Sequence, residues 1–206
     1  CLVVSGGHSH ILEVKGYNEV KIIGKTRDDA AGEAFDKVGR RLGLSYPGGV
    51  ELDKIAEKGD PGSFKLPVPL KGEENTYDFS FSGLKTAMIN IINNINQKNE
   101  PVPVENLAAS FRKSVVSCLV SNFIKAAEDY KYKTLAIAGG VSANSLLRSS
   151  LEEKCSERDF KFFKPDIKYC GDNAAMVASQ AYYEFLSKKQ ASLNLNARAS
   201  MPIDLD

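Results

Sequence analysis

The amino-acid sequence predicts an α/β fold in which a mixed β-sheet is flanked by helices. Three observations predict it: strand-like and helix-like runs alternate in the second half, paired glycines follow two of the strands, and the apolar period changes from two to 3.6. The chain has 206 residues, 43% of them hydrophobic, and a chain of this length buries roughly 70% of its unfolded surface. Its core therefore needs no metal or disulfide.

The charge and the cysteines narrow the classes of function. There are 27 Lys and Arg against 26 Asp and Glu, and this net charge of +1 predicts no long-range attraction to nucleic acid or to an anionic membrane. The four cysteines form no C-x-x-C pair, so we expect reduced thiols. No apolar run reaches the roughly 18 residues of a membrane helix, and no secretory signal opens the chain. We therefore expect a cytoplasmic protein that acts without a membrane.

The chain begins at Cys1, inside a predicted strand and without an initiator Met. Native N-termini usually fray before their first element. We therefore expect this chain to be the later portion of a longer protein, with part of its site on the earlier portion.

The first 44 residues predict three strands and a helix. Residues 2–14 form two apolar runs joined at Gly6 and Gly7, and residues 18–26 form a further strand. Residues 27–44 follow helical periodicity, and Gly43 supplies the helix stop. The apolar face of this helix comprises Ala31, Ala34, Phe35, Val38 and Leu42.

A turn, two helices and an irregular stretch follow. In residues 45–49 the paired glycines are expected to accept positive φ in a turn, and residues 50–59 predict a short helix. Residues 60–77 are rich in Pro and Gly, which indicates irregular or edge structure. In residues 78–97 we expect Ser82 to cap a helix whose apolar stripe comprises Leu84, Met88, Ile91, Ile92 and Ile95.

The rest of the chain predicts a long helix and then alternating strands and helices. A loop at residues 98–105 leads into a helix that ends near Tyr130, with a buried seam of Leu107, Phe111, Val115, Cys118, Leu119 and Phe123. Strand, helix, strand and helix then follow at residues 133–140, 142–155, 159–165 and 172–189, with Asp172 at the cap of the last helix.

Three pairs of glycines could hold a charged ligand against bare backbone. We call them the three glycine bends: Ser5-Gly6-Gly7 between strands, Pro47-Gly48-Gly49 before a helix, and Gly139-Gly140 between a strand and a helix. Without a Cβ atom, backbone N–H groups can approach an anion closely, which suits a nucleotide. A single Gly-Gly pair is most simply a tight turn, but three in one domain favour a shared ligand site as much as three plain turns.

Three polar residues have both a structural and a ligand-binding interpretation. Asp36 lies on a polar helical stripe, so a solvated face is the simpler interpretation and a ligand contact the alternative. Asp172 begins a helix, where a carboxylate accepts free N–H groups. Asn144 lies in the first turn of the helix after the third bend, where its amide either caps that helix or reaches a ligand.

The two histidines, His8 and His10, alternate on one predicted strand, so both point to the same face. A third metal ligand is not apparent nearby and no H-E-x-x-H helix occurs, which favours a structural or ligand-orienting role for His8 over metal binding. No serine has an identifiable basic partner, so acyl-enzyme chemistry is disfavoured.

Five blocks of sequence carry a family resemblance. In order they are VVSGGHSH, DDAAGEAFDKVGRRLGLSYPGG, DFSFSGLKTA, IAGGVSANSLLR and YCGDNAAMVA. They resemble the TsaD family of tRNA threonylcarbamoyladenosine biosynthesis proteins, also called the glycoprotease or O-sialoglycoprotein endopeptidase family. The resemblance runs over nearly the whole chain and covers only the C-terminal two-thirds of a family member.

The resemblance implies the two-lobed actin, Hsp70 and sugar-kinase (ASKHA) fold, with a ligand between the lobes. Residues 1–172 would be the second lobe, and residues 173–206 a C-terminal helix and tail that pack on the missing first lobe. The implied reaction transfers a threonylcarbamoyl group from threonylcarbamoyl-adenylate to the exocyclic amine of the adenosine next to the tRNA anticodon. The implied partners are tRNA, this adenylate or another adenine nucleotide, a paralogous dimerising protein and a P-loop ATPase.

The resemblance also implies site residues, block by block. The phosphate or acyl end of the adenylate would be wrapped by Val3, Val4, Ser5, Gly6 and Gly7. Asp36 and Asp53 would hydrogen-bond the ribose, Gly49 would admit the adenosine close to the backbone, and Asn144 would contact the base or the ribose. The catalytic residues stay unassigned.

One divalent metal ion, iron or zinc, is also implied by the resemblance. It would be held by an upstream H-x-x-x-H helix and by Asp172, the single metal ligand that this chain would contribute. One carboxylate cannot hold a catalytic divalent ion in competition with water. We therefore expect this chain by itself to lack the metal and to be catalytically inactive.

Other functions stay open at this point. The same fold would serve an ATP-dependent phosphotransferase or a noncatalytic nucleotide-binding lobe, and the older family name suggests a metalloendopeptidase, which the missing zinc helix disfavours. Affinity for tRNA would need a local basic cluster. The candidates Arg40, Arg41, Lys85 and Arg112 are more simply interpreted as solvated helix charges.

Overall fold

Five strands form one sheet in the order β3-β2-β1-β4-β5 in the computed structural model, which describes residues 1–70, 73, 76–188 and 190–197. The strands are β1 (Leu2–Val4), β2 (Ser9–Gly16), β3 (Glu19–Lys25), β4 (Thr134–Ala138) and β5 (Lys161–Phe163). The β1–β2 and β2–β3 pairs are antiparallel, whereas β1–β4 and β4–β5 are parallel. The predicted mixed sheet is confirmed.

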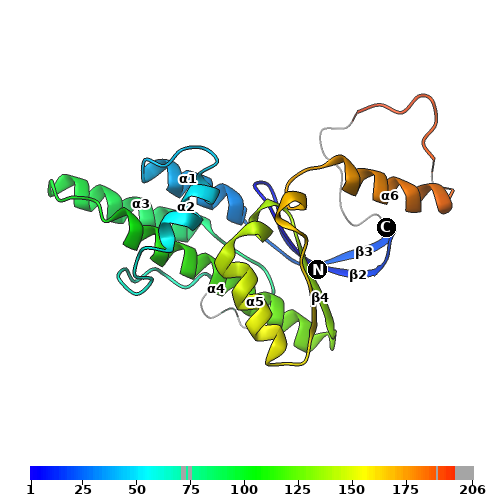
Figure 1. Ribbon diagram of the computed structural model, residues 1–206, viewed down its shortest axis with the longest axis horizontal. Coiled ribbons are helices and arrows are strands. Elements are labelled where there is room, and N and C mark those ends of the chain that lie inside the picture. The colour runs from blue at the N-terminus through cyan, green and yellow to red at the C-terminus, as the bar shows by residue number, and fades with distance from the viewer. Residues whose placement is uncertain (71–72, 74–75, 189, 198–206) are drawn as a thin grey trace.

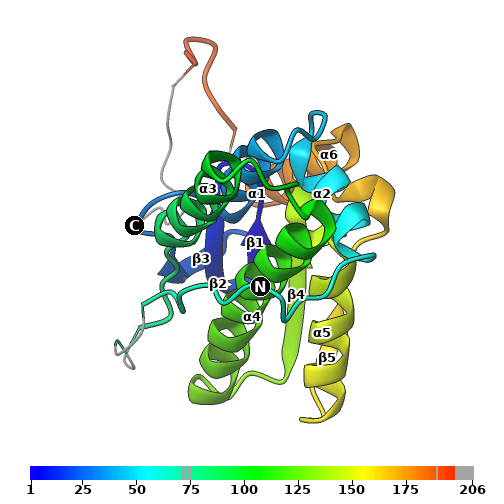
Figure 2. The same ribbon diagram turned by 90° about the vertical axis from the view of Figure 1, so that its left-hand side faces the viewer.

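The helices lie on both sides of this sheet. Five of them, α1 to α5, cover one side, and α6 lies beyond the other side (Figures 1 and 2). Two short 3₁₀ helices, η1 (Gly140–Ala143) and η2 (Ile167–Tyr169), connect β4 to α5 and β5 to α6. The α-helices are α1 (Ala31–Arg41), α2 (Gly48–Ala56), α3 (Ser82–Gln97), α4 (Val104–Asp129), α5 (Ser145–Ser156) and α6 (Ala174–Leu186).

The core fills the space between the sheet and helices α1 to α5. Alternate strand residues such as Leu2, Val4 and Ile11 are buried, because successive side chains of a strand point to opposite faces. The helical stripes predicted from the sequence face this core, although Ile91, Ile95 and Cys118 are only half-buried. The predicted irregular stretch at residues 60–77 is confirmed where it is described, while residues 71–72 and 74–75 lie outside the described residues.

Three helix starts differ from the sequence prediction. Helix α2 begins at Gly48, so the paired glycines are its first helical residues and have no positive φ. Ser82 does not cap α3, because Phe81 holds the N-cap position without a side-chain cap. Asn173 caps α6 in place of Asp172, since its Oδ1 accepts a hydrogen bond from the Met176 N–H at 3.0 Å.

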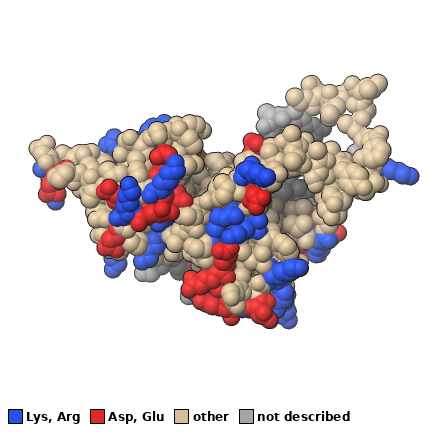
Figure 3. Space-filling model, in the orientation of Figure 1, with Lys and Arg blue, Asp and Glu red and all other residues tan. Residues whose placement is uncertain are grey.

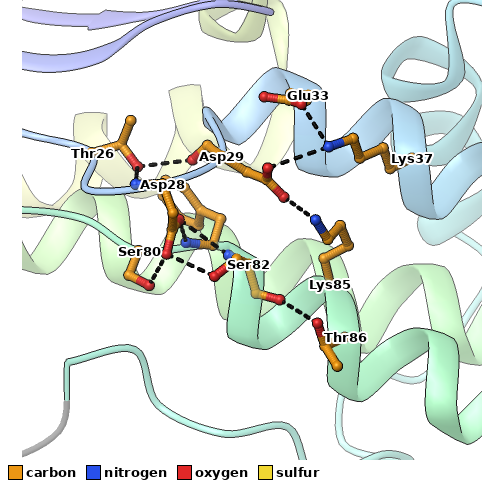
Figure 4. Close-up of polar contacts among 10 residues, drawn as sticks. Thr26, Asp28, Asp29, Glu33, Lys37, Ser80, Ser82, Lys85 and Thr86 are labelled. Atoms are coloured by element: carbon orange, nitrogen blue, oxygen red, sulfur yellow. Dashed lines mark hydrogen bonds and ion pairs between the residues drawn. The ribbon is translucent and has the colours of Figure 1, made fainter.

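The start of α3 is capped from a distant part of the chain instead (Figure 4). The Asp28 carboxylate accepts hydrogen bonds from the Phe81 N–H at 2.8 Å and from the Ser82 N–H at 3.2 Å. The hydroxyl groups of Ser80 and Ser82 also donate to it. A tertiary contact therefore supplies the acceptor that a local cap would have supplied, because the first N–H groups of a helix need one.

The neighbouring carboxylate of Asp29 ties α1 to α3. It accepts from Lys37 of α1 at 3.2 Å and from Lys85 of α3 (Figure 4). Burial alone would raise the pKa of Asp29, but the hydrogen bonds from Lys85 and Lys37 outweigh it and hold the pKa below its ordinary value. The pKa of Asp28 is lowered in the same way, with burial outweighed by its hydrogen bonds from Ser80 and Ser82.

Helix α6 contacts the rest of the molecule at the tip of the β2–β3 hairpin. Tyr17 stacks on Tyr183, the Gln180 amide donates to the Tyr17 carbonyl at 3.3 Å, and the Asn18 amide donates to the Ser187 hydroxyl at 3.0 Å. No described side chain of α6 is buried. In Figure 3 the part of the surface that α6 forms carries few charged side chains. Within the described residues, no helix has the length and apolar character needed to cross a bilayer.

The packing of Gly139 generates a stability prediction. Its φ of +91° is left-handed, and a Cβ atom there would lie 2.3 Å from the Val4 carbonyl oxygen, whereas a Cβ on Gly140 would meet nothing within 4 Å. We expect Gly139→Ala to lower the free energy of unfolding by about 2 kcal/mol or more, because the left-handed cost of roughly 1–2 kcal/mol adds to the clash. Gly140→Ala is the matched control and should cost less than about 1 kcal/mol. Urea denaturation measures both, and equal losses would contradict this account of Gly139.

The lowered pKa values of Asp28 and Asp29 generate a prediction about acid. A carboxyl whose pKa is lower in the folded than in the unfolded state stabilises the fold above its unfolded pKa, and this stabilisation is lost as the pH falls through the folded pKa. We expect stability to fall below about pH 4, the ordinary pKa of Asp. The loss between pH 7 and pH 3 should be smaller in Asp28→Asn, measured by urea denaturation at each pH. Replacing the exposed Glu19 by Gln should leave the loss unchanged, and an undiminished loss in Asp28→Asn would refute the assignment.

Candidate functional site

A pocket of about 380 Å³ lies where the three glycine bends meet. Parallel strands β1 and β4 end at the same edge of the sheet, and the first and third bends follow them directly. Ligands of open α/β sheets bind outside the carboxyl ends of such strands. The lining of this pocket, which we call the bend pocket, includes Gly6, Gly49, Gly140, Asp36, Asp53 and Asn144.

Close backbone packing at other glycines holds the walls of the bend pocket together. Gly32 of α1 lies against the first bend, where a Cβ atom would be 2.5 Å from the Ser5 carbonyl oxygen. Gly39 of α1 packs on Gly48 of α2, where a Cβ atom would be 3.0 Å from its backbone. By contrast, Gly6 and Gly140 have open space where a Cβ would lie. Some glycines therefore bring the walls together, and others leave backbone facing open space.

Asp36 faces the bend pocket and also caps α2. Its Oδ1 accepts a hydrogen bond from the Gly49 N–H at 3.0 Å. A carboxylate has acceptor positions for about four hydrogen bonds, so this cap leaves capacity for a ligand. The solvated helix face suggested by periodicity is not what the structure shows.

Asp53 is engaged by the protein on both of its carboxylate oxygens. Oδ1 accepts from Arg112 at 2.9 Å, from the Asn144 amide at 2.7 Å and from the Ser145 hydroxyl at 3.2 Å. Oδ2 accepts from the Ser145 N–H at 2.9 Å, at the start of α5. Asp53 therefore joins α2, α4 and α5, and less of its capacity remains for a ribose than at Asp36.

Asn144 also has local partners. Its Oδ1 accepts from the Leu147 N–H at 2.9 Å and caps α5, while its Nδ2 donates to Asp53. The side chain is buried, at 8% exposure. Of the two interpretations that the sequence left open, the local cap is present, and contact with a base or ribose stays a prediction.

The first bend is tightened by its own serine. The Ser5 hydroxyl oxygen accepts from the Gly7 N–H at 3.3 Å and from the His8 N–H at 3.0 Å. A hydroxyl group that accepts two bonds can still donate its own hydrogen. The Gly7 amide, which was expected to be bare, is therefore occupied, and the Ser5 O–H can still turn toward an anion.

The two valines of the first block lie outside the bend pocket. Val4 is fully buried in the core, and Val3 pairs with His10 and Ala138 in the sheet. Neither lines the bend pocket. Val3 and Val4 can affect a ligand by positioning the first bend, which follows them. A direct contact between either valine and the adenylate stays a prediction.

The described residues do not fit a metal site by themselves. None of them form a group of three or more His, Cys, Asp or Glu side chains placed to hold a metal ion. Asp172 is exposed and does not line the bend pocket. The rings of His8 and His10 lie 5.4 Å apart between centroids, in agreement with their predicted shared face. The role of Asp172 as a metal ligand stays a prediction from the resemblance.

Three of the candidate basic residues have partners within the molecule. Lys85 pairs with Asp29, Arg112 pairs with Asp53, and Arg41 donates to Asn93. Each of these side chains has a different partner, and the contacts do not define a basic cluster. Helix charges with local partners are the interpretation that the structure supports.

A larger groove of about 690 Å³ lies between α4 and α5. Several charged residues on its rim have partners within the protein, such as Arg158 with Glu128 and Lys154 with Glu157. The groove contains none of the glycine bends. Size alone therefore does not mark the site, and the bend pocket is the candidate.

Sequence reasoning missed the apolar walls of the bend pocket. Phe35, Val50, Val141 and Ile167 line it. The sequence places Phe35 on a helix face directed at the core. In the structure Phe35 packs in the core and also forms part of the pocket wall. Nothing in the sequence around Ile167 signals its position, because only the tertiary fold brings this segment to the bends.

The strand order β3-β2-β1-β4-β5, with the bend pocket at the strand ends, is that of the actin, Hsp70 and sugar-kinase fold class. A sequence profile described as "TsaD: tRNA N6-adenosine threonylcarbamoyltransferase" matches residues 1–179. The chain therefore belongs to the TsaD family, and the predicted resemblance is confirmed.

Relatives at the level of sequence carry the same description. The chain is 49% identical over 196 residues to the tRNA N6-adenosine threonylcarbamoyltransferase of Caldicellulosiruptor saccharolyticus, covering 95% of this chain and 57% of the relative. It is 48% identical over 197 residues to that of Clostridium botulinum strain 657, covering 96% and 58%. The chain thus spans 57–58% of the length of these relatives.

Two solved structures share the fold. The crystal structure of T. kodakarensis HypF has a TM-score of 0.56 at 20% identity and covers 83% of this chain and 21% of that chain. Full-length HypF in the phosphate- and nucleotide-bound form has a TM-score of 0.56 at 16% identity and covers 77% and 20%. At these identities the likeness shows the fold alone.

The Asp53–Arg112 pair generates a stability prediction. Their side chains are only 17% and 11% exposed, so removing one partner leaves a poorly solvated charge. We expect Asp53→Ala and Arg112→Ala each to destabilise by about 2–4 kcal/mol. The double variant should lose less than the sum, with a coupling of about 1–3 kcal/mol in a double-mutant cycle measured by urea denaturation.

The control for this cycle is the exposed pair Glu51 and Lys54 on α2, which lie 2.9 Å apart. Exposed pairs contribute less than about 1 kcal/mol, so its cycle should give little coupling. Additive losses at Asp53 and Arg112 would show that the two side chains act independently.

Proposed function

We propose that the whole protein transfers a threonylcarbamoyl group from threonylcarbamoyl-adenylate to the exocyclic amine of the adenosine next to the tRNA anticodon. This chain would supply the lobe that holds the adenylate. The single observation that carries the proposal is the convergence of the three glycine bends and Asp36 on the bend pocket. Family membership supports tRNA modification as the context.

The adenosine part of the adenylate fits the half of the bend pocket formed by α1 and α2. Asp36 keeps acceptor capacity beyond its bond to the Gly49 N–H, and a ribose hydroxyl group would donate to it. Phe35 and Val50 supply apolar surface for a base. Asp53 would act mainly by holding α2 and α5 in place, because its oxygens already accept four hydrogen bonds.

The phosphate end of the adenylate fits the first bend. Gly6 lines the pocket with open space where a side chain would be, so backbone can approach an anion there. The Ser5 hydroxyl group holds the turn through the Gly7 and His8 N–H groups and can donate its own hydrogen to a phosphate oxygen. Because the adenylate already carries a good leaving group, positioning and charge stabilisation suffice, and no covalent protein intermediate is required.

The proposal also includes a metal ion, partner proteins and a first lobe that would pack on this chain. A divalent metal, iron or zinc, would need ligands besides Asp172. The resemblance supports a dimerising paralogue and a P-loop ATPase as partners, and we propose a cytoplasmic location from the sequence. We also propose that residues 173–206 pack on a first lobe, which is supported by the exposure of Met176, Val177 and Phe185 on α6. Residues 189 and 198–206 of that segment lie outside the described residues.

The proposed nucleotide site can be tested by titrating this chain with AMP. We expect Asp36→Asn to weaken AMP binding by roughly 10-fold or more, because a hydrogen bond to a charged group contributes about 1.5–3 kcal/mol and 1.4 kcal/mol is a factor of ten. The asparagine can still cap α2, so the melting temperature should change little. Isothermal titration calorimetry measures the affinity.

The matched control is Glu33→Gln, on the same helix. Glu33 pairs with Lys37 and does not line the bend pocket, so its affinity for AMP should be that of the wild type. Equal weakening in both variants, or none in Asp36→Asn, would count against the site.

We also expect the purified chain to give no transfer of threonylcarbamoyl to tRNA, because its described residues supply no complete metal site. A radiolabelled transfer assay with supplied threonylcarbamoyl-adenylate measures this. Turnover by this chain alone would refute the prediction, and ATP hydrolysis without tRNA would instead favour the phosphotransferase alternative.

A further inference from the structure

Arg148 of α5 bridges two segments that both line the bend pocket. Its Nη1 donates to the Ser142 carbonyl in η1 at 3.0 Å, and its Nη2 donates to the Pro165 carbonyl, two residues before η2, at 2.8 Å. Nη1 also contacts the Cys170 sulfur at 3.8 Å. The residues on either side of Ser142 line the pocket, and so does Ile167 of η2.

The chemistry of the contacts calls for arginine. Its partners here are two backbone carbonyl oxygens and a thiol, so the guanidinium group links backbone to backbone. The planar guanidinium presents donors in a fixed fork and can hold two carbonyls at a set separation, whereas a lysine ammonium group is a single flexible point of contact. Arg148 is half-buried, and Ser142, whose carbonyl it contacts, is fully buried.

The segment that Arg148 holds is otherwise exposed. Ile167 is 61% and Tyr169 is 48% exposed, while Cys170, beside the guanidinium, is only 5% exposed. Within the part of the chain that the structure describes, the bonds from Arg148 are the hydrogen bonds that join residues 165–170 to α5. The Lys164–Glu152 ion pair ties the residue just before this segment to α5, and Arg148 is the side chain of α5 that bonds to the segment itself.

We propose that Arg148 is a positioning residue that holds residues 165–170 against η1, so that Ile167 forms one wall of the bend pocket. Because Asp172 follows this segment by two residues, the same contact limits where Asp172 can lie. The inference rests on the proposed function only in taking the bend pocket to be the nucleotide site.

Thiol labelling of this chain tests the inference without any nucleotide. We expect Arg148→Met to raise the rate of iodoacetamide labelling at Cys170 by at least about 10-fold, measured peptide by peptide with mass spectrometry, because the segment moves away from α5. A faster rate reports greater exposure of the Cys170 sulfur, which is only 5% exposed in the wild type. Arg148→Lys should give an intermediate rate, since one carbonyl can still be held.

Two controls separate positioning from general loss of structure. Arg158→Met removes an arginine that lies two residues beyond the end of α5 and pairs with Glu128, and it should leave Cys170 labelling unchanged. Cys155, which is 1% exposed, should stay unlabelled in every variant that folds. Labelling of Cys155 in Arg148→Met would show that this variant has lost its structure. The rate of Cys170 labelling would then be compared between Arg148→Lys and the wild type.

A second measurement connects the contact to the bend pocket. AMP should bind Arg148→Met about 5-fold to 10-fold more weakly than the wild type, and Arg158→Met as tightly as the wild type. Unchanged Cys170 labelling, or faster labelling with unchanged AMP affinity, would overturn the positioning role. If the wild type does not bind AMP, the proposed function fails, and the labelling rates still decide whether Arg148 holds the segment.

Discussion

The parallel pairing of β1 with β4 is the constraint on which the rest of the structure depends. It brings the ends of both strands to one edge of the sheet, where Gly139 lets the chain pass directly against the Val4 carbonyl. The first and third glycine bends then leave the sheet side by side. Gly32 brings α1 onto the first bend by the same kind of backbone contact. Close main-chain packing thus forms the walls of the bend pocket. Gly6 and Gly140, which take no part in this packing, have open space where a Cβ atom would lie.

Three aspartates make the same kind of electrostatic contact in this molecule, and two of them, Asp36 and Asp53, line the bend pocket. Asp28 accepts from the N–H groups at the start of α3, Asp36 from an N–H group at the start of α2, and Asp53 from the first N–H group of α5. In each case the acceptor comes from a different element than the helix it caps. Because the first N–H groups of a helix lack internal partners and carry partial positive charge, a distant carboxylate can satisfy them and fix two elements together. The same carboxylates that could meet a ligand therefore also position the helices, and Asp36 differs from Asp53 in how much capacity remains.

The bend pocket and helix α6 are both accessible from outside the described part of the molecule. The bend pocket lies at an edge of the sheet, with exposed residues such as Ile167 on its rim. Helix α6 stands beyond the sheet and contacts the tip of the β2–β3 hairpin, where Tyr17 stacks on Tyr183 and Gln180 donates to the Tyr17 carbonyl. The chain spans 57–58% of the length of the relatives it matches. Both the bend pocket and helix α6 therefore present surface that the described residues leave uncovered.

The sequence by itself determined the order and type of the elements, the core stripes and the family. Period and glycine placement are local properties, so residues such as Phe35 and Gly43 could be assigned from their neighbours alone, and five ordered motifs identified the family. Only the tertiary structure decided which polar groups meet. Ser82 does not cap its own helix because Asp28 reaches it from more than 50 residues away, and Asp53 is committed to Arg112 and Ser145 from two other helices. Hydrogen-bond partners distant in sequence depend on the packing of whole elements, which no local pattern of residues encodes.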